Sequence, residues 1–430
     1  MHRKLISAAI SLAFFAPIHA HASEAELLAR INQMASELEQ LKVQLKENQL
    51  KTETIQQQQA SVQAAPAVAV MPAVVTPAAS STVITGYGEL NYNRPSKNAS
   101  AAQTDVRRAV IGIQHRFDDK TKLVSEFEWE HAVTSRGDAG EAAVEQLYVE
   151  REFDNGLRGK AGLFLIPSGM LNTNHEPTAY YGVERNFVET AIIPSTWREV
   201  GVALSGEFAN GLTWDTGITT GFDITKWDAA STDGRESPLG SIHQEGQLAK
   251  SRNLSVHGAL NWRGVPGLLI GGSVFTGNAG HKTAGFAAPD ARITIYDLHA
   301  RYTPGHWDLS SVYARGDIRN VDALNRTFVG EPTPTFVPAS FAGWYAQAAY
   351  QLYKSGDYTF SPFARYEQFN TARRYSAPAG LGVPGAAEEK VATVGANLRI
   401  GEGVVLKADY QKFNEDKTRD RLNLGVGFSY

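Results

Sequence analysis

The segment from Ile166 to Trp197 holds the closest grouping of side chains that could do chemistry, and it follows neither a strand nor a helix period. This stretch contains three glutamates, one arginine, one histidine and several aromatic residues. The glutamates outnumber the arginine, so its charge balance is acidic. Charged groups that face water attract ions of opposite charge and repel ions of the same charge. The candidate residues of the segment are His175, Glu176, Tyr180, Tyr181, Glu184, Arg185 and Glu189.

A hydrolytic site is the second chemistry that this segment allows, because Ser195 and His175 belong to the same stretch. A serine nucleophile needs a base within hydrogen-bonding distance, and spacing along an irregular segment does not establish that distance. The 11 histidines are scattered, cysteine is absent, and neither H-E-x-x-H nor G-x-S-x-G occurs. We therefore predict no enzyme activity, catalytic residue, metal site or cofactor, and keep a hydrolase as an alternative.

A second set of polar side chains recurs at every other position of extended stretches. Arg108 and Arg116 share a face with Gln114, opposite Ala109, because successive residues of a strand point to opposite sides. Asp105 to Arg108, "DVRR", either belongs to such a polar wall or lies at the solvated end of a strand. The candidate wall residues are Arg108, Arg116, Glu126, Glu128, Tyr148, Arg365 and Lys407.

The elements that must position these residues are strands, from residue 83 to the end of the sequence. The stretch "KLVSEFEWEH", 122–131, places Leu123 and Trp129 on one face and glutamates on the other. The last stretch, "RLNLGVGFSY", alternates apolar residues with Arg421, asparagine, glycine and serine. One face of each strand is therefore apolar, and the other can contact water.

Short and long connections alternate between these strands. Seven short turns rich in Gly, Asn, Asp and Pro occur, and eight longer links lie between them, including 166–197 and one from Asp223 to about Gln244. Sixteen antiparallel strands with turns at one end and loops at the other predict an all-β fold, a transmembrane β-barrel. Aromatic residues such as Phe117 and Trp262 beside the turns favour this barrel over a soluble β-sandwich.

The first 82 residues differ from the rest in composition. Residues 1–22 combine a basic start, a short apolar run and an A-x-A site, which predicts a signal peptide. Residues 23–59 carry apolar positions at alternating steps of four and three, which predicts a coiled coil. Residues 60–82 form an Ala/Pro-rich linker, and 83–430 the barrel.

Part of the barrel sequence resembles a known family. "KAGLFLIPSG", the segment 166–197 and "PSTWREVGVALSG" are similar to the corresponding region of the phosphate-selective porin O and P family of Gram-negative bacteria. The resemblance implies a sixteen-stranded, usually trimeric outer-membrane porin, whose third loop enters the lumen and which passes anions such as phosphate. The acidic balance of 166–197 departs from that selectivity.

The sequence as a whole predicts an outer-membrane porin that passes small hydrophilic solutes or inorganic ions through a channel narrowed by its third extracellular loop. We expect a homotrimer in outer-membrane lipid, with the coiled coil in the periplasm and in contact with the periplasm or cell wall. A net charge of -4 argues against a nucleic-acid partner. The alternative is an envelope tether in which conduction is incidental.

Overall fold

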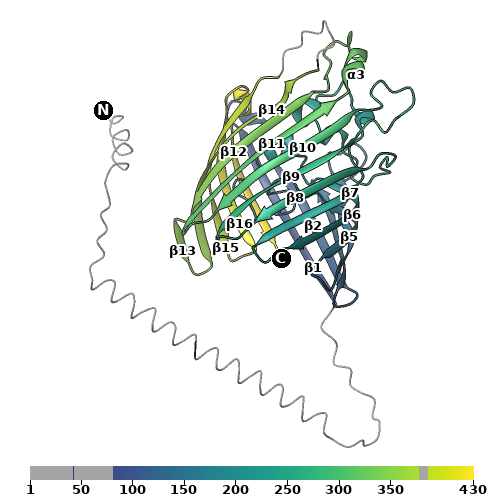
Figure 1. Ribbon diagram of the computed structural model, residues 1–430. Helices are drawn as coiled ribbons and strands as arrows, with labels where there is room; N and C mark the ends of the chain where they lie inside the picture. The colour runs from purple at the N-terminus through teal and green to yellow at the C-terminus, as the bar shows by residue number, and fades with distance from the viewer. Residues whose placement is uncertain (1–41, 43–80, 377–385) are drawn as a thin grey trace, which may run out of the picture. The chain divides into compact units, whose positions relative to one another are not determined.

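The structure is a computed structural model that describes residue 42 and residues 81–376 and 386–430. The expected signal peptide, the coiled coil apart from residue 42, and most of the linker lie outside the described residues. The described chain forms one antiparallel β-sheet that closes on itself (Figure 1). Within these ranges, no helix is long and apolar enough to cross a membrane.

Strands β1 to β17 follow one another around the sheet in chain order, and every pair of hydrogen-bonded strands is antiparallel. Their bounds are β1 Thr82–Pro95, β2 Gln103–Arg116, β3 Thr121–Glu130, β4 Glu141–Glu152, β5 Arg158–Leu165, β6 Arg198–Glu207, β7 Leu212–Thr219, β8 Ser255–Trp262, β9 Leu268–Asn278, β10 Arg292–Tyr302, β11 Trp307–Arg319, β12 Ser340–Tyr350, β13 Tyr353–Ser355, β14 Tyr358–Arg374, β15 Glu389–Ile400, β16 Val404–Phe413 and β17 Arg421–Ser429.

The predicted sixteen-stranded barrel is confirmed. Strands β12 and β13 both pair with β14 and are separated only by residues 351–352, so they act as one interrupted strand. The barrel closes where β1 pairs with β17, from Tyr87 opposite Ser429 to Pro95 opposite Arg421. Closure leaves no open edge, so every strand has a hydrogen-bonded neighbour on both sides.

Seven short turns and eight longer loops connect the strands at opposite ends of the barrel, as the sequence predicts (Figure 1). Loop 3 is 166–197, with a π-helical turn η2 at Val188–Ile192. The fourth link is longer than expected: loop 4 runs from 220 to 254. Loop 4 contains three short helices and polar irregular stretches. Because of them, the alternation of apolar and polar residues does not show where β8 begins. The remaining short helices are η1 Ala99–Ala101, η3 Ile224–Lys226, α2 Asp233–Glu236, η4 Gly240–Ile242, α3 Asp322–Thr327 and η5 Lys417–Arg419.

Side chains alternate between an apolar outer face and a polar inner face. In β6, Val200, Val202 and Leu204 are 39%, 57% and 45% exposed, whereas Glu199 and Ala203 on the opposite face are buried. The same outward row of Val, Leu and Ile continues over the neighbouring strands. A soluble protein rarely leaves so large an apolar surface uncovered, so this band is suited to lipid.

An apolar core fills part of the barrel interior near the loop end. Trp197 of loop 3 packs on Phe222 of loop 4 and Phe275 of β9, with ring centroids 5.1 and 4.5 Å away. Val188 and Ile192 belong to the same buried cluster. Burial of these apolar groups holds loops 3 and 4 against the wall, because each buried side chain of this size contributes about 1.5–3 kcal/mol.

Candidate functional site

Asn172 joins the two ends of loop 3. Its side-chain Nδ2 donates to the carbonyl oxygens of Ile166 and Trp197 at 2.7 and 2.8 Å, and its Oδ1 accepts from the Trp197 N–H at 2.6 Å. All three groups are buried. One asparagine therefore satisfies backbone groups that water cannot reach, and it fixes the direction in which loop 3 leaves the barrel wall.

Two wall carboxylates hold one side of loop 3. Asp297 of β10 accepts from the Gly169 N–H at 3.0 Å. Glu367 of β14 accepts from the Phe187 N–H at 2.6 Å. Because these carboxylates lie on the inner face of the sheet and are buried, the hydrogen bonds place loop 3 inside the barrel.

Glu189, a predicted selectivity residue, is part of the framework of loop 3. Its carboxylate accepts from the backbone N–H groups of Met170 and Leu171 at 2.5 and 2.7 Å, from Asn186 Nδ2 at 2.8 Å, and from the Tyr345 hydroxyl at 3.1 Å. Burial raises the pKa of Glu189, and these donated hydrogen bonds oppose the rise. The carboxylate thus braces the loop rather than facing solutes.

His175 attaches loop 3 to the opposite part of the wall. Its Nδ1 lies 3.0 Å from the Asn172 carbonyl oxygen, and its Nε2 lies 2.6 Å from Glu145 Oε1 and 2.8 Å from the Tyr87 hydroxyl. A carbonyl oxygen can only accept, so Nδ1 carries a proton. Nε2 faces the Glu145 carboxylate and the Tyr87 hydroxyl, so the ring joins loop 3 to β4 and β1.

Loop 3 approaches the wall closely at β17, whose glycines leave room for it. A Cβ added to Gly427 would lie 2.5 Å from Pro177 Cβ, and one added to Gly425 would lie 3.1 Å from Val183. Val183 also donates its N–H to Asp409 of β16 at 2.6 Å. The glycines of the last strand are therefore explained by contact with loop 3.

Arg185 lies at the centre of loop 3 and bonds within it. Its guanidinium donates to Ser195 Oγ at 2.8 Å, Thr196 Oγ1 at 2.9 Å and the His175 carbonyl oxygen at 3.1 Å. No hydrogen bond joins Ser195 to His175 in the described part of the chain, because each has the other partners given above. The geometry gives the hydrolase alternative no nucleophile and base pair.

Tyr180 and Lys407 meet a buried charge network on the wall. The Tyr180 hydroxyl donates to Glu89 at 2.7 Å, and Lys407 Nζ lies 3.6 Å from the centre of the Tyr180 ring, a cation–π contact. Arg108 donates to Glu89 at 2.7 Å and to Glu128 at 2.9 Å. One guanidinium thus faces two buried carboxylates at this point of the wall.

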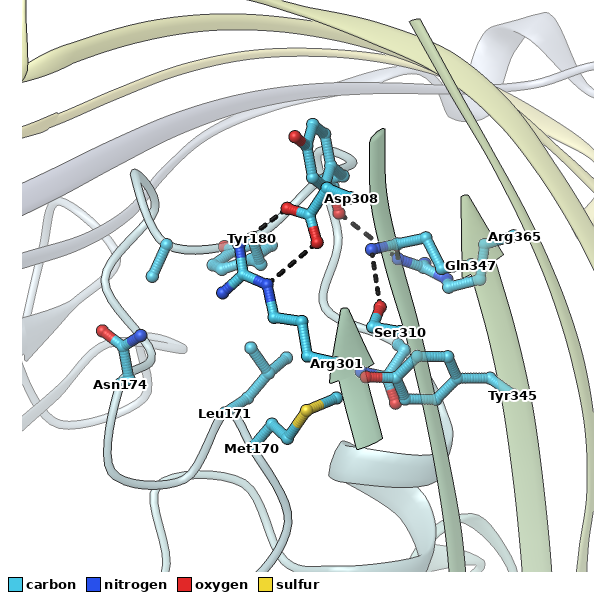
Figure 2. Close-up of a pocket in the computed structure, with 13 residues that line it drawn as sticks. Met170, Leu171, Asn174, Tyr180, Arg301, Asp308, Ser310, Tyr345, Gln347 and Arg365 are labelled. Carbon is cyan, nitrogen blue, oxygen red and sulfur yellow. Dashed lines mark hydrogen bonds and ion pairs between the residues drawn. The ribbon is translucent and has the colours of Figure 1, made fainter. Parts of the chain in front are cut away.

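A small cavity of about 50 Å³ lies between loop 3 and strands β10 to β14 (Figure 2). Arg301 makes a bidentate pair with Asp308 at 2.9 and 2.6 Å on its floor. Arg365 donates to Glu367 at 2.7 Å and to the Tyr181 carbonyl oxygen at 3.3 Å. Both arginines are therefore neutralised by carboxylates, and Arg365 serves also to hold loop 3.

The remaining predicted residues lie in different surroundings. Glu176 is exposed on loop 3, and Glu184 accepts from Asn93 of β1 at 3.0 Å. Glu126 accepts from Gln146 at 2.5 Å on the wall. Tyr148 lies near the ring of Phe164, and Arg116 is exposed at the turn end of β2, away from loop 3.

Two β-bulges turn extra side chains inward. The β1–β2 register shifts between Glu89 and Leu90, so Arg107 and Arg108 are adjacent residues opposite one position. The β3–β4 register shifts after Glu126 and leaves Glu145 unpaired beside Gln146. A bulge re-aims side chains in this way, so "DVRR" supplies the inner wall with Arg107 as well as Arg108.

Strict alternation missed Glu145 and Arg107 for this reason, because a bulge shifts the inward positions by one residue. The alternation in β1 could have identified Tyr87 and Glu89 as inward-facing residues, because they are two positions apart; both face inward and are buried. The tethering role of Asn172 carries no local signal, since it depends on where the two ends of loop 3 meet.

A cleft of about 280 Å³ opens at the loop end of the barrel, between the β2–β4 wall and loops 3 and 4. We name it the entrance cleft. Arg198 pairs with Glu245 at 2.9 Å on its loop side, and His243 Nδ1 lies 3.1 Å from the same carboxylate. The residues that line it are Arg107, Arg108, Glu128, Glu130, Glu141, Ala143, Ser195, Thr196, Arg198, His243 and Glu245.

Comparison with known proteins supports the fold. The chain is 28% identical over 361 residues to an uncharacterised protein of Aquifex aeolicus (strain VF5), covering 81% of this chain and 79% of that protein. No family model matches the chain, so the resemblance to the phosphate-selective porin O and P family stays a prediction.

Two solved barrels align with most of the described chain. OmpF of Salmonella typhi, solved in complex with daunomycin, has a TM-score of 0.55 at 14% identity, covering 81% of this chain and 97% of its own. The outer membrane channel DcaP of Acinetobacter baumannii has a TM-score of 0.52 at 10% identity, with coverage of 81% and 97%. At such identities the likeness shows the shared barrel fold.

Proposed function

We propose that this protein is an outer-membrane porin, a water-filled channel for passive diffusion of small hydrophilic solutes. The observation that carries the proposal is loop 3, whose backbone and side chains bond to the inner face of the barrel at β1, β4, β10, β14 and β16. A sixteen-stranded barrel is too wide for its own side chains to fill. A loop bonded inside it narrows the water path and places charged groups beside it.

The outer membrane is the environment that fits the outer face of the barrel. Rows of exposed Val, Leu and Ile cover the strands, and exposed aromatic residues such as Phe153, Phe208 and Trp307 lie beside the short turns. Lipid contact requires an apolar band bordered by aromatic residues. The fold shared with DcaP, an outer membrane channel, supports the same location.

The charges along the path favour solutes other than phosphate. Arg108 lies within ion-pair distance of Glu89, Glu128 and Glu130 at 2.7, 2.9 and 3.4 Å, and Arg365 is paired with Glu367. A guanidinium that already faces carboxylates has little remaining attraction for an anion. We therefore place the phosphate selectivity of the resembling family second to a neutral, cationic or zwitterionic solute.

Single-channel recording in planar lipid bilayers tests the proposal. The purified, folded protein in symmetric KCl is expected to insert with discrete, long-lived steps of current, because a porin conducts when it is inserted. An envelope tether, the alternative for a chain with a coiled-coil arm, need not conduct. Insertion shown by protease protection in the same lipid, without any current steps, would rule out the channel.

A further inference from the structure

The entrance cleft carries charged groups of both signs that the described residues pair only in part. Arg107 is half-buried beside the cleft, and its guanidinium has no hydrogen bond or ion pair among the described residues. Arg198 is 5% exposed, and its Nε has no hydrogen-bond partner in the described chain although its terminal nitrogen donates to the Thr196 carbonyl oxygen and pairs with Glu245. A buried donor without a partner is unfavourable because it has lost its hydrogen bonds to water, so a bound acceptor at this point stabilises the cleft.

Two carboxylates on the wall of the cleft lie close enough to be stabilised by a positively charged group. Glu130 and Glu141 lie directly opposite each other in the β3–β4 register, and like charges in that position repel. Glu130 lies 3.4 Å from Arg108, and that guanidinium is already bonded to Glu89 and Glu128. A positively charged group between the two glutamates removes this repulsion.

We propose that the entrance cleft binds a small zwitterionic solute, an α-amino acid or short peptide, with its carboxylate at Arg107 and Arg198 and its ammonium group between Glu130 and Glu141. The inference rests on the proposed channel function and names the solute class. The volume of about 280 Å³ is near the lower end of small-ligand sites, which suits a solute of this size. The hydroxyls of Ser195 and Thr196 line the same cleft and can bond further polar groups of the solute.

Three probes of matched size separate the charge requirements. L-alanine has both charges, propionate lacks the ammonium group, and ethylamine lacks the carboxylate. Each is added to single channels in about 0.1 M KCl, where salt leaves short-range charge interactions in place. L-alanine is expected to lower the current in a saturable way, and the other two to need several-fold higher concentrations.

Substitutions in the cleft test the assigned residues. Arg107→Gln and Glu130→Gln are each expected to weaken the alanine effect by about fivefold or more, which corresponds to about 1 kcal/mol. Arg263→Gln and Glu207→Gln, which alter exposed charges at the turn end, are the matched controls and should leave it unchanged. Heat-modifiable gel mobility confirms that each variant is a folded barrel.

The outcomes distinguish this inference from the channel itself. Absence of KCl current in every variant overturns the proposed function. Normal KCl current without saturable alanine inhibition overturns the zwitterion site and leaves the channel intact. Equal inhibition by ethylamine and alanine shows a simple cation site, and equal inhibition by propionate shows an anion site; either result also overturns the inference.

Discussion

Asn172 shows how much of loop 3 depends on one amide. Replacement by alanine removes three hydrogen bonds and leaves the buried Trp197 N–H without a partner, whereas the carbonyls of Ile166 and Trp197 each keep one backbone N–H donor. We expect Asn172→Ala to lower the free energy of unfolding by roughly 2–4 kcal/mol, measured by urea titration of gel mobility. Asn174→Ala is the control, because Asn174 is exposed on the same loop. Equal stability of the two variants would contradict the tethering role.

Glu245 gives the loop end of the barrel a defined pH response. Burial alone would raise the pKa of Glu245, but the hydrogen bond and charge of His243 and the charge of Arg198 outweigh it and lower that pKa below 4.5. A lowered folded-state pKa adds stability above the unfolded pKa, and this stability is lost as pH falls through the folded value.

Hydrogen exchange of loop 4 measures this response. After correction for intrinsic rates, protection of 220–254 is expected to fall below about pH 4.5 in the wild type. Glu245→Gln should already show the reduced protection at neutral pH and change little on acidification. An unchanged acid response in the variant would assign the pH dependence to other groups.

For individual residues, the residue type and its position in the strand alternation predict which charged side chains face inward. Arg108, Glu128, Arg365 and Lys407 are all buried on the inner face. Their partners could not be predicted, because ion pairs such as Arg365 with Glu367 depend on side-chain direction. Buried inner carboxylates such as Glu145 were missed because a bulge, which has no sequence signature here, shifts the alternation.

At the scale of elements, the sixteen strands and the alternation of turns and loops follow from the sequence because each strand has its own period and each turn its own residues. The structure inside the loops cannot be predicted from the sequence in this way, because it depends on contacts with residues far away in the chain. Loop 4 is an example: the indole of Trp227 donates to the Thr335 carbonyl oxygen at 2.8 Å, a contact between two loops far apart in the chain.

The attachment of loop 3 to β1 and β4 rests on His175. His175→Ala removes the contacts with Glu145 and Tyr87 and leaves the buried Glu145 carboxylate with only the Tyr87 hydroxyl as a donor in the described chain. We expect a looser loop 3, seen as higher mean conductance and greater open-channel noise in bilayer recordings. His306→Ala, at the turn between β10 and β11, is the control. Identical noise in the two variants would show that this contact does not restrain the loop.

At the scale of the whole molecule, the sequence predicts two further features that await measurement, the coiled coil of 23–59 and the homotrimer. A coiled coil buries its apolar seam against partner helices, so it would stabilise an oligomer of barrels in the outer membrane, from the periplasmic side. Deletion of 23–59 is expected to lower the temperature at which the oligomer dissociates on native gels. An unchanged dissociation temperature would remove this role and leave contact with the cell wall.

We propose that loop 3 narrows a water-filled barrel. A variant in which 173–195 is replaced by a short Gly/Ser linker removes most of loop 3, and its single-channel conductance is compared with that of the wild type in the same KCl solution. Retained Asn172, Thr196 and Trp197 keep the two ends of the loop joined. We expect discrete current steps in both proteins and a conductance raised severalfold in the shortened variant. Equal conductance of the two folded barrels would show that loop 3 does not narrow the channel.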